Sequence, residues 1–596
     1  MSNKLKNKNH SYHTKNLQDY IMLLPVMLVI LVVPLIVRGI QVNTYLSDCI
    51  WYSKATKAFD IFLYSKSLVF ITSCCLMLIC VLILTFKKSI DWRVYFQRNK
   101  IYILPLGIYM ILAGISTILS DYTRISLRGM VEHYETVWVL LGYGILTFYI
   151  GLFLKEQKQV HILINIMVGM IAVVTVIGLT QFFKLDFFQT ALGSSLISKD
   201  PLSFRFNKGH VYASLYNPNY VGVFTSLIIP LLISRIIYTK VTVKKLLYGG
   251  LTIGVLCCAY GAKSSSGIIG IFAGTITFLI LLALVYRTYW IKYFRNITII
   301  ISTILFSIIG VGFIVGNQYI GRMKQHHLES RLTEIQTQAD YVSIIYNNNE
   351  LKIQFNVKEN NYSFVFLDSN NNEITYDLST DGQFITIKDE SFNALKFYVL
   401  NYDGTIVFGI DVDDSTWYFT NQTDGTYYYC NVYGKLLKLN QQEEFKNYWS
   451  IGSGRGYIWD RTLPIIKEHW LLGTGPDTYA MYFPNTEYLN LYHSGFQGEV
   501  ITKPHSIYLQ IAAQTGIPSL LAFISFYLIY LVSSIRLFIK KIINTYEVQI
   551  GIAILAGTTG YMVACLANDS TVAVAPLFWT LIGIGIGINH IVKKDA

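Results

Sequence analysis

The sequence predicts an α-helical polytopic membrane protein of about 12 transmembrane helices with an inserted extracytoplasmic β-rich domain. Apolar residues make up 53% of the chain and charged residues only 14%. Apolar runs of about twenty residues recur along it, which is the length that crosses the hydrocarbon core of a bilayer. One long polar segment between these runs instead contains short β-branched and aromatic stretches separated by turn residues, a pattern typical of strands.

The apolar runs fall into two groups, about nine before the polar segment and about three after it. In order they are Tyr20–Val37, Ser67–Phe86, Ile101–Leu119, Val137–Leu154, Val160–Phe183, Tyr220–Ser234, Leu246–Gly261, Gly267–Val285 and Ile297–Val315, then Ser506–Leu531, Ile550–Leu566 and Thr571–Ile591.

Clusters of Lys and Arg predict the orientation, because loops on the cytoplasmic side carry an excess of these residues. With the N-terminus inside, the clustered loops all fall on the cytoplasmic side. They are Lys87–Lys100, Lys155–Gln159, Arg235–Lys245, Arg287–Arg295, Arg536–Val548 and the tail at Lys593 and Lys594. We expect both termini in the cytoplasm, an uncleaved N-terminal anchor, and the polar segment outside the cytoplasmic (inner) membrane.

The runs divide the chain into five expected parts. They are an N-terminal membrane domain (1–316), an extracytoplasmic linker (317–339), an extracytoplasmic β-rich insert (340–445), an extracytoplasmic catalytic-loop segment (446–505) and a C-terminal membrane domain (506–596). The insert holds sixteen Asp and Glu against six Lys and Arg. We attribute this acidity to solubility, with docking onto a cationic partner as the alternative.

Cationic side chains collect on the expected outer face, close to the membrane. They are Arg124, Arg128, His133, Arg205, Lys208, His210, Lys263, Arg455, Arg461 and His505. Arginine binds phosphate oxygens with a planar fork, so the group is suited to holding a diphosphate. The alternative is that these side chains reach toward lipid headgroups or pair with nearby acids. The sequence shows no P-loop, no Asp-rich metal motif and no GxSxG elbow.

The stretch from Gly452 to Pro518 contains the most specific pattern. Arg455 and Trp459 stand one helical turn apart, a turn with Gly473 and Gly475 follows, and His505 stands at the start of a long apolar run. This arrangement resembles the bacterial O-antigen ligase family, which includes related polysaccharide polymerases. Tyr479, Tyr508, Leu509 and Gly516 also match the family pattern.

Two earlier segments extend the resemblance. Arg205 and Gly209 precede Asn217-Pro218-Asn219, and Glu135 follows Gly129 in an outer loop. Departures from the family pattern lie at Ser506 in place of Asn, at His133 in place of Arg and at Pro518-Ser519 in place of a glycine. The family often has the arginine of an SRxG run after the seventh span, whereas this chain has Lys263 before Ser264-Ser265-Ser266-Gly267, so its positive charge stands in a shifted position.

The resemblance implies a membrane glycosyltransferase that uses a glycan on undecaprenyl diphosphate. His505 would be the catalytic base, because an imidazole accepts a proton near neutral pH. Arg205, Arg455 and Lys263 would bind the donor diphosphate in place of a metal ion, so the enzyme would be metal-independent and need no cofactor. A single displacement would invert the configuration at the anomeric carbon. The supporting residues would be Trp459, Glu135, Asn217, Asn219 and Tyr508.

Three functions remain open at this stage. A ligase transfers a finished glycan to a glycan, lipid or protein acceptor, and a polymerase of the same family joins lipid-linked repeat units in polysaccharide biosynthesis. A flippase or transporter of lipid-linked sugars is the third reading. Transporters place their binding sites near the bilayer midplane, whereas the charges here gather at the outer rim. The bilayer and the lipid-linked donor are the expected partners, and nucleic acid is not.

Overall fold

The computed structural model describes residues 20–199, 209–286 and 331–594, apart from short gaps at 359–360, 380–383, 403, 414, 423, 445 and 542–544. Within these residues, nine helices are long and apolar enough to cross a membrane, and two shorter apolar helices accompany them. The long ones are α3 (Leu63–Phe86), α4 (Trp92–Ile118), α7 (Gln157–Phe182), α9 (Pro218–Tyr238), α10 (Thr242–Ala262), α11 (Ser265–Val285), α17 (Ile517–Lys541), α18 (Tyr546–Ala564) and α19 (Ala575–Lys594), and the shorter ones are α2 (Leu24–Leu35) and α6 (Val137–Phe153). Each predicted run overlaps one of these helices except Ile297–Val315, which lies outside the described residues. The polytopic helical class is therefore confirmed.

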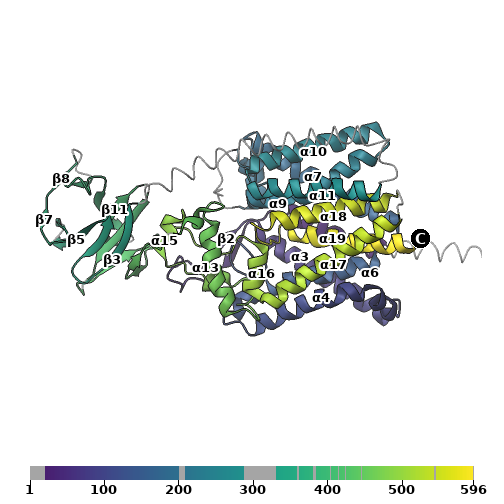
Figure 1. Ribbon diagram of the computed structural model, residues 1–596, viewed down its shortest axis with the longest axis horizontal. Helices are drawn as coiled ribbons and strands as arrows, with labels where there is room; N and C mark the ends of the chain where they lie inside the picture. The colour runs from purple at the N-terminus through teal and green to yellow at the C-terminus, as the bar shows by residue number, and fades with distance from the viewer. Residues whose placement is uncertain are drawn as a thin grey trace, which may run out of the picture.

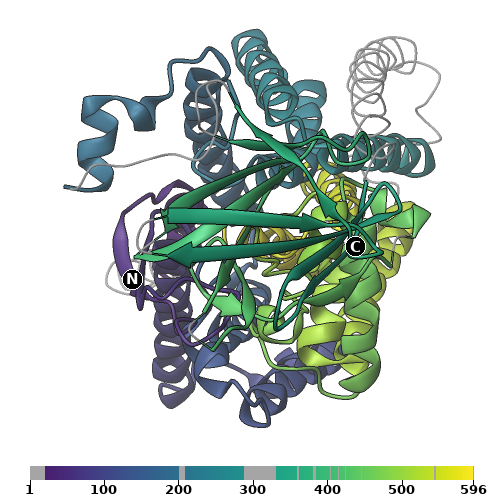
Figure 2. The same cartoon turned by 90° about the vertical axis from the view of Figure 1, so that its left-hand side faces the viewer.

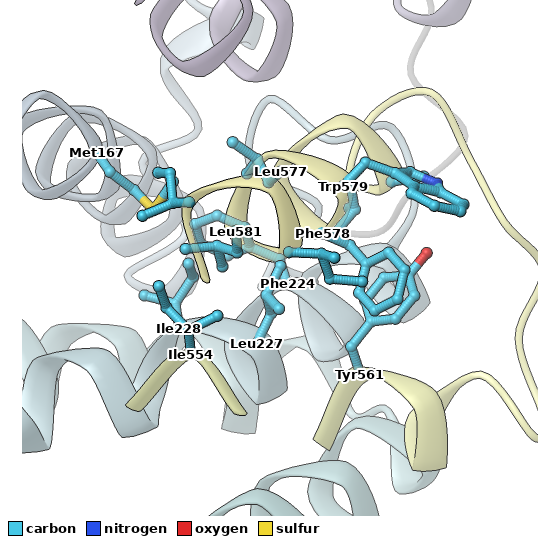
Figure 3. Close-up of a cluster of buried hydrophobic side chains, with 14 of the residues drawn as sticks. Met167, Phe224, Leu227, Ile228, Ile554, Tyr561, Leu577, Phe578, Trp579 and Leu581 are labelled. Carbon is cyan, nitrogen blue, oxygen red and sulfur yellow. The ribbon is translucent and has the colours of Figure 1, made fainter. Parts of the chain in front are cut away.

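Three helices form the centre of the membrane domain. All of the most apolar stretch of α19, and 83% of those of α9 and α18, is buried inside the protein. Figure 3 shows how side chains from α7, α9, α18 and α19 meet, with the ring of Tyr561 stacked on Phe578 at 4.3 Å between centroids. Such burial explains why these helices are apolar on all sides.

Small residues let the central helices approach closely. A Cβ atom added to Gly267 of α11 would lie 2.4 Å from the Cα atom of Gly222 in α9. A Cβ atom on Gly557 of α18 would lie 2.2 Å from the carbonyl oxygen of Leu227. This is the packing expected between membrane helices, where close backbone contact replaces the hydrophobic effect as the source of cohesion.

The predicted span Ser506–Leu531 was wrong in one respect, because it folds as two helices. The first, α16 (Ile507–Thr515), ends at Gly516, and α17 begins at Ile517. Gly516 adopts a φ of +92°, which favours glycine. The apolar pattern does not mark this break, since α16 is buried against α4 and α13 (Arg455–Glu468) instead of against lipid.

The inserted domain is a sandwich of two antiparallel sheets. One sheet has the order β15-β3-β4-β5-β6-β7, and the other has the order β14-β13-β12-β11-β10-β9-β8. The strands are β3 (Leu332–Thr337), β4 (Val342–Tyr346), β5 (Asn349–Lys358), β6 (Asn361–Leu367), β7 (Glu373–Ile374), β8 (Tyr376–Leu378), β9 (Ile385–Ile387), β10 (Lys396–Tyr402), β11 (Thr405–Val412), β12 (Ser415–Asn421), β13 (Tyr427–Cys430), β14 (Leu436–Leu437) and β15 (Asn440–Gln442). Phe355 and Phe408 pack across the two sheets at 5.2 Å between ring centroids. The first strand lies within the segment 317–339 that the sequence suggested as a linker.

The sandwich lies at one end of the helical bundle, and α19 ends at the other (Figure 1); in Figure 2 the sandwich faces the viewer. It is tied to its neighbours by specific contacts. Leu489 of α15 (Tyr488–His493) is part of the sandwich core. The Asn431 side chain donates to the Ile50 carbonyl at 2.8 Å, and the Lys435 ammonium donates to the Ser47 carbonyl at 2.7 Å. The sandwich thus contacts both the loop that carries α15 and the first loop of the chain, which forms the hairpin of β1 (Ile40–Asn43) and β2 (Lys57–Asp60).

Candidate active site

The candidate site lies at the end of the bundle that faces the sandwich. Four parts of the chain meet there: the segment 503–506 before α16, the loop 565–571 between α18 and α19, the first turn of α9, and the turn between α10 and α11. The centre of this region is a pair formed by His505 and Asp569.

The imidazole of His505 faces a buried carboxylate. The Nδ1 atom lies 3.1 Å from Oδ2 of Asp569, and the side chains are 30% and 1% exposed, respectively. The backbone N–H of Ser506 donates to the other carboxylate oxygen, Oδ1, at 3.2 Å. Burial alone would raise the pKa of the Asp569 carboxyl, but His505 and Lys503 hold it below its usual value. An ionised carboxylate in this place orients the ring of His505.

The backbone around His505 is held from both sides. Trp459 of α13 donates its indole N–H to the carbonyl of Pro504 at 3.0 Å. On the other side, the N–H of Ile507 is shared between the carbonyls of Asn568 at 2.8 Å and Cys565 at 3.0 Å. His505 itself has a φ of +53°, an uncommon conformation for a residue with a side chain. Such conformations persist where surrounding contacts enforce them, and they concentrate at functional sites.

A buried lysine lies beside the pair. Lys503 is 9% exposed, and its ammonium donates to the hydroxyl of Tyr220 in the first turn of α9 at 2.7 Å. The site therefore contains a cation and an imidazole from the segment 503–506 and a carboxylate from the loop 565–571.

Glu135 lies beneath this surface and is fully enclosed. Its carboxylate accepts hydrogen bonds from the hydroxyls of Tyr143 and Ser570 and, at 2.7 Å, from the side-chain amide of Gln510. Burial raises the pKa of the Glu135 carboxyl. With every oxygen engaged by protein donors, Glu135 joins α6, α16 and the 565–571 loop instead of facing the surface.

His133 connects the same network to the glycine turn. Its Nδ1 atom contacts the Asp477 carboxylate, and its Nε2 atom lies 3.2 Å from the amide nitrogen of Gln510. The other oxygen of Asp477 accepts the N–H of Met130 at 2.7 Å. Burial alone would lower the pKa of His133, but Asp477 and Glu135 raise it above its ordinary value. The imidazole thus lies buried between two carboxylates.

The motif glycines have a direct packing reason. Gly475 donates its N–H to the carbonyl of Gln514 at 2.9 Å, at the end of α16. A Cβ atom on Gly473 would lie 2.3 Å from the carbonyl carbon of Gln514, and one on Gly516 would lie 2.3 Å from the carbonyl oxygen of Leu471. Any side chain at these two positions would push the turn away from α16, and α16 starts directly after His505.

Several of the predicted residues lie around the pair. Tyr508 donates to the Met562 carbonyl at 3.0 Å and so fixes the first turn of α16 on α18. Asn217 caps α9 by accepting the N–H of Asn219 at 2.9 Å. Lys263 is exposed in the turn between α10 and α11. Three residues later, Ser266 accepts a hydrogen bond at 2.7 Å from Asn568, the neighbour of Asp569.

Of the two predicted arginines, the structure describes one, Arg455. Arg455 is half-buried and begins α13, one turn before Trp459, so the helix that holds Pro504 also carries this cation. Its guanidinium lies 3.5 Å from the Gly452 carbonyl. Arg205 lies outside the described residues. Among the residues that are described, no group of three or more His, Cys, Asp or Glu side chains is arranged to hold a metal ion.

Sequence reasoning missed Asp569, Lys503, Asp477 and Gln510. The signal for Asp569 was present, since it is a carboxylate in a short turn between two apolar runs. Lys503 stands two residues before the predicted base. Gln510 and Asp477 carried no comparable signal, because amides and single acids are common in helices and turns.

Comparison with known protein families gives one match. Residues 416–524 match the family model for O-antigen ligase. The matched segment begins in β12, includes Trp459, Asp477 and His505, and ends in α17. A search of curated proteins found no match to the chain.

Proposed function

We propose that this membrane protein, whose residues 416–524 match the family model for O-antigen ligase, transfers a glycan from undecaprenyl diphosphate to an acceptor hydroxyl. The observation that carries the proposal is the pair of His505 and Asp569, in which a partly exposed imidazole contacts a buried carboxylate at 3.1 Å. Such a pair is suited to general-base catalysis, which needs a correctly oriented imidazole within reach of the acceptor.

The orientation follows from the charges at the two ends of the bundle. Lys593 and Lys594 end α19 at the end far from the sandwich, and basic residues also occupy the α9–α10 turn. Cytoplasmic loops are enriched in Lys and Arg. This supports a cytoplasmic position for both termini and an extracytoplasmic position for the sandwich and the site, where a lipid-linked donor presents its head group.

In the proposed reaction, Nε2 of His505 accepts the proton of the acceptor hydroxyl, because Nδ1 faces Asp569. The acceptor oxygen forms a bond to the anomeric carbon, and the bond from this carbon to the diphosphate breaks. The diphosphate leaves with the electron pair and is stabilised by Arg205, Arg455 and Lys263. This single displacement inverts the anomeric carbon, and the protein cations serve in the place of a metal ion.

A polymerase of the same family is the second candidate. It would share the residues of the site, because the acceptor would then be another lipid-linked repeat unit. Deletion of the gene separates the two functions. Single repeats left on the acceptor indicate a lost polymerase, whereas loss of the whole transferred chain indicates a lost ligase.

The test of the chemistry is a transfer assay with purified full-length protein and a lipid-linked glycan. We expect His505→Ala to lower turnover by about 10² to 10⁴ while donor binding is retained, since the base acts on the acceptor. Asp569→Asn should also lower turnover. His469→Ala, which changes a histidine at the far end of α13, is the matched control and should leave turnover unchanged. EDTA should have no effect.

The arginines should behave differently from the base. Arg455→Ala and Arg205→Ala should weaken donor binding as well as turnover, because the diphosphate is charged before and after it leaves. Lysine at either position should restore only part of the activity, since it keeps the charge and loses the planar fork. Turnover of His505→Ala at the level of the unchanged protein would refute the mechanism, and loss of activity in EDTA that Mg²⁺ restores would refute its metal independence.

A further inference from the structure

The surroundings of Lys503 are those expected of a cation that binds an anion. Its ammonium is 9% exposed and carries three N–H donors, of which one is directed at Tyr220. Among the described residues, no carboxylate lies within 4.0 Å of the ammonium nitrogen. A buried charge costs several kcal/mol unless a partner compensates it, so a buried lysine whose hydrogen-bonding partner is a neutral phenol is a costly arrangement.

The groups around Lys503 raise the pKa of its ammonium, although no carboxylate of the described residues lies within ion-pair distance of it. Burial alone would lower its pKa, but Tyr220, Asp569 and Glu132 raise the pKa above its ordinary value. Asp569 is already engaged by His505. The ring of Tyr220 lies 5.3 Å from the ammonium and adds a cation–π contact. The ammonium is thus charged at neutral pH, with two N–H donors left for a ligand.

The position of Lys503 connects it to the proposed chemistry. It precedes His505 by two residues, a span of at most about 7 Å along the backbone. The intervening Pro504 is fixed by the indole of Trp459 at 3.0 Å. His505 contacts the Asp569 carboxylate, and Lys503 is near enough to the same carboxylate to lower its pKa, so the imidazole and the ammonium lie near one buried acid.

We propose that Lys503 binds the phosphate group that is attached to the anomeric carbon of the lipid-linked donor, and that Tyr220 holds the ammonium in place for this contact. The inference rests on the proposed function and adds a residue to its site. As the bond from the anomeric carbon to the phosphate oxygen breaks, the electron pair moves onto that oxygen, and an N–H of Lys503 donates to it.

This assignment gives Lys503 a different role in the reaction from that of Lys263 and Arg455. Lys263 is exposed and Arg455 is half-buried, so water screens part of their charge. A buried ammonium acts through a medium of lower dielectric constant, where the same charge stabilises a leaving anion more strongly. We expect the exposed cations to attract and hold the donor, and Lys503 to act on the leaving oxygen.

The test uses binding of farnesyl diphosphate to the purified full-length protein, with farnesol as the uncharged reference. Lys503→Met should weaken farnesyl diphosphate binding by about tenfold to a hundredfold, the effect of losing a hydrogen bond to a charged group, and should leave farnesol binding unchanged. Lys503→Arg should retain much of the affinity. Lys467→Met, which removes an exposed lysine of α13, is the matched control.

Each outcome separates this inference from the proposed function. If Lys503→Met binds the diphosphate normally and loses turnover, Lys503 acts through Asp569, and the inference is wrong while the proposed function stands. If the unchanged protein does not distinguish farnesyl diphosphate from farnesol, the proposed donor itself is wrong. Should Lys503→Met fail to fold, Tyr220→Phe removes one hydroxyl and should weaken diphosphate binding several-fold, and unchanged affinity in that variant would overturn the inference.

Discussion

His133 shows at the scale of one residue how the site depends on buried charge. Its imidazole lies between the carboxylates of Asp477 and Glu135, and all three side chains are almost entirely buried. Burial alone would lower the pKa of this imidazole, but the two nearby acids raise it above its ordinary value. The same residue connects the glycine turn to the loop before α6.

The raised pKa of His133 predicts a pH dependence of stability. A histidine whose pKa is higher in the folded state stabilises the fold fully below its unfolded value of about 6.5, and this stabilisation is lost as the pH rises through the folded value. We therefore expect the melting temperature in detergent to fall as the pH rises above about 6.5. His133→Gln should lower stability and flatten this alkaline slope.

His493 is the control for this experiment. Burial lowers its pKa to about 4, so it is neutral throughout the range in which His133 titrates. His493→Gln should leave the alkaline slope as it is in the unchanged protein. An equal slope in His133→Gln and in the unchanged protein would contradict the raised pKa of His133.

At the scale of the element, the important unit is the contact between the glycine turn and α16. The turn supplies N–H groups of Thr474 and Gly475 to the last carbonyls of α16, at 2.9 Å in both cases. It thereby satisfies acceptors that a helix end leaves open. Since α16 begins directly after His505, the turn holds the helix that presents the base.

Gly473→Ala is predicted to separate the turn from α16. The new Cβ atom would clash with the backbone of Gln514, and a φ of +68° would add strain. We expect the free energy of unfolding to fall by a few kcal/mol, the order seen for overpacking, and we expect turnover to fall as well. Gly107→Ala in α4 is the matched control, because a Cβ atom there meets nothing within 4 Å. A neutral effect of Gly473→Ala would show that the contact does not hold the site.

At the scale of the whole molecule, the sandwich and the membrane domain form a continuous structure around the site. The sandwich core includes Leu489, and its turn residues Asn431 and Lys435 bind the first loop of the chain.

The topology leads to a labelling experiment on intact cells. In a background with Cys49→Ser, we expect Asp424→Cys in the sandwich to react with a membrane-impermeant maleimide. Lys240→Cys in the α9–α10 turn should react only after the cells are opened, because basic loops stay in the cytoplasm. Both positions are exposed in the structure, so accessibility within the fold does not limit either reaction. The reverse pattern of labelling would invert the proposed orientation.

The sequence by itself determined the features that depend on local composition. Apolar runs of the length of a bilayer identified the membrane helices, and β-branched and aromatic stretches identified a β-rich insert. The motif around Arg455, Trp459 and His505 lies in the segment that matches the O-antigen ligase family model, so the resemblance could be seen in the sequence. These properties are encoded in residues that are neighbours in the chain.

Only the tertiary structure decided which distant residues meet. Asp569 stands 64 residues after His505 in the chain and contacts it across the turn between α18 and α19. Lys503 meets Tyr220 of a helix that lies far earlier in the sequence. The division of Ser506–Leu531 into α16 and α17 likewise depends on the glycine turn that packs against it. Pairings of this kind are set by how helices pack in three dimensions, which the pattern of a single stretch does not contain.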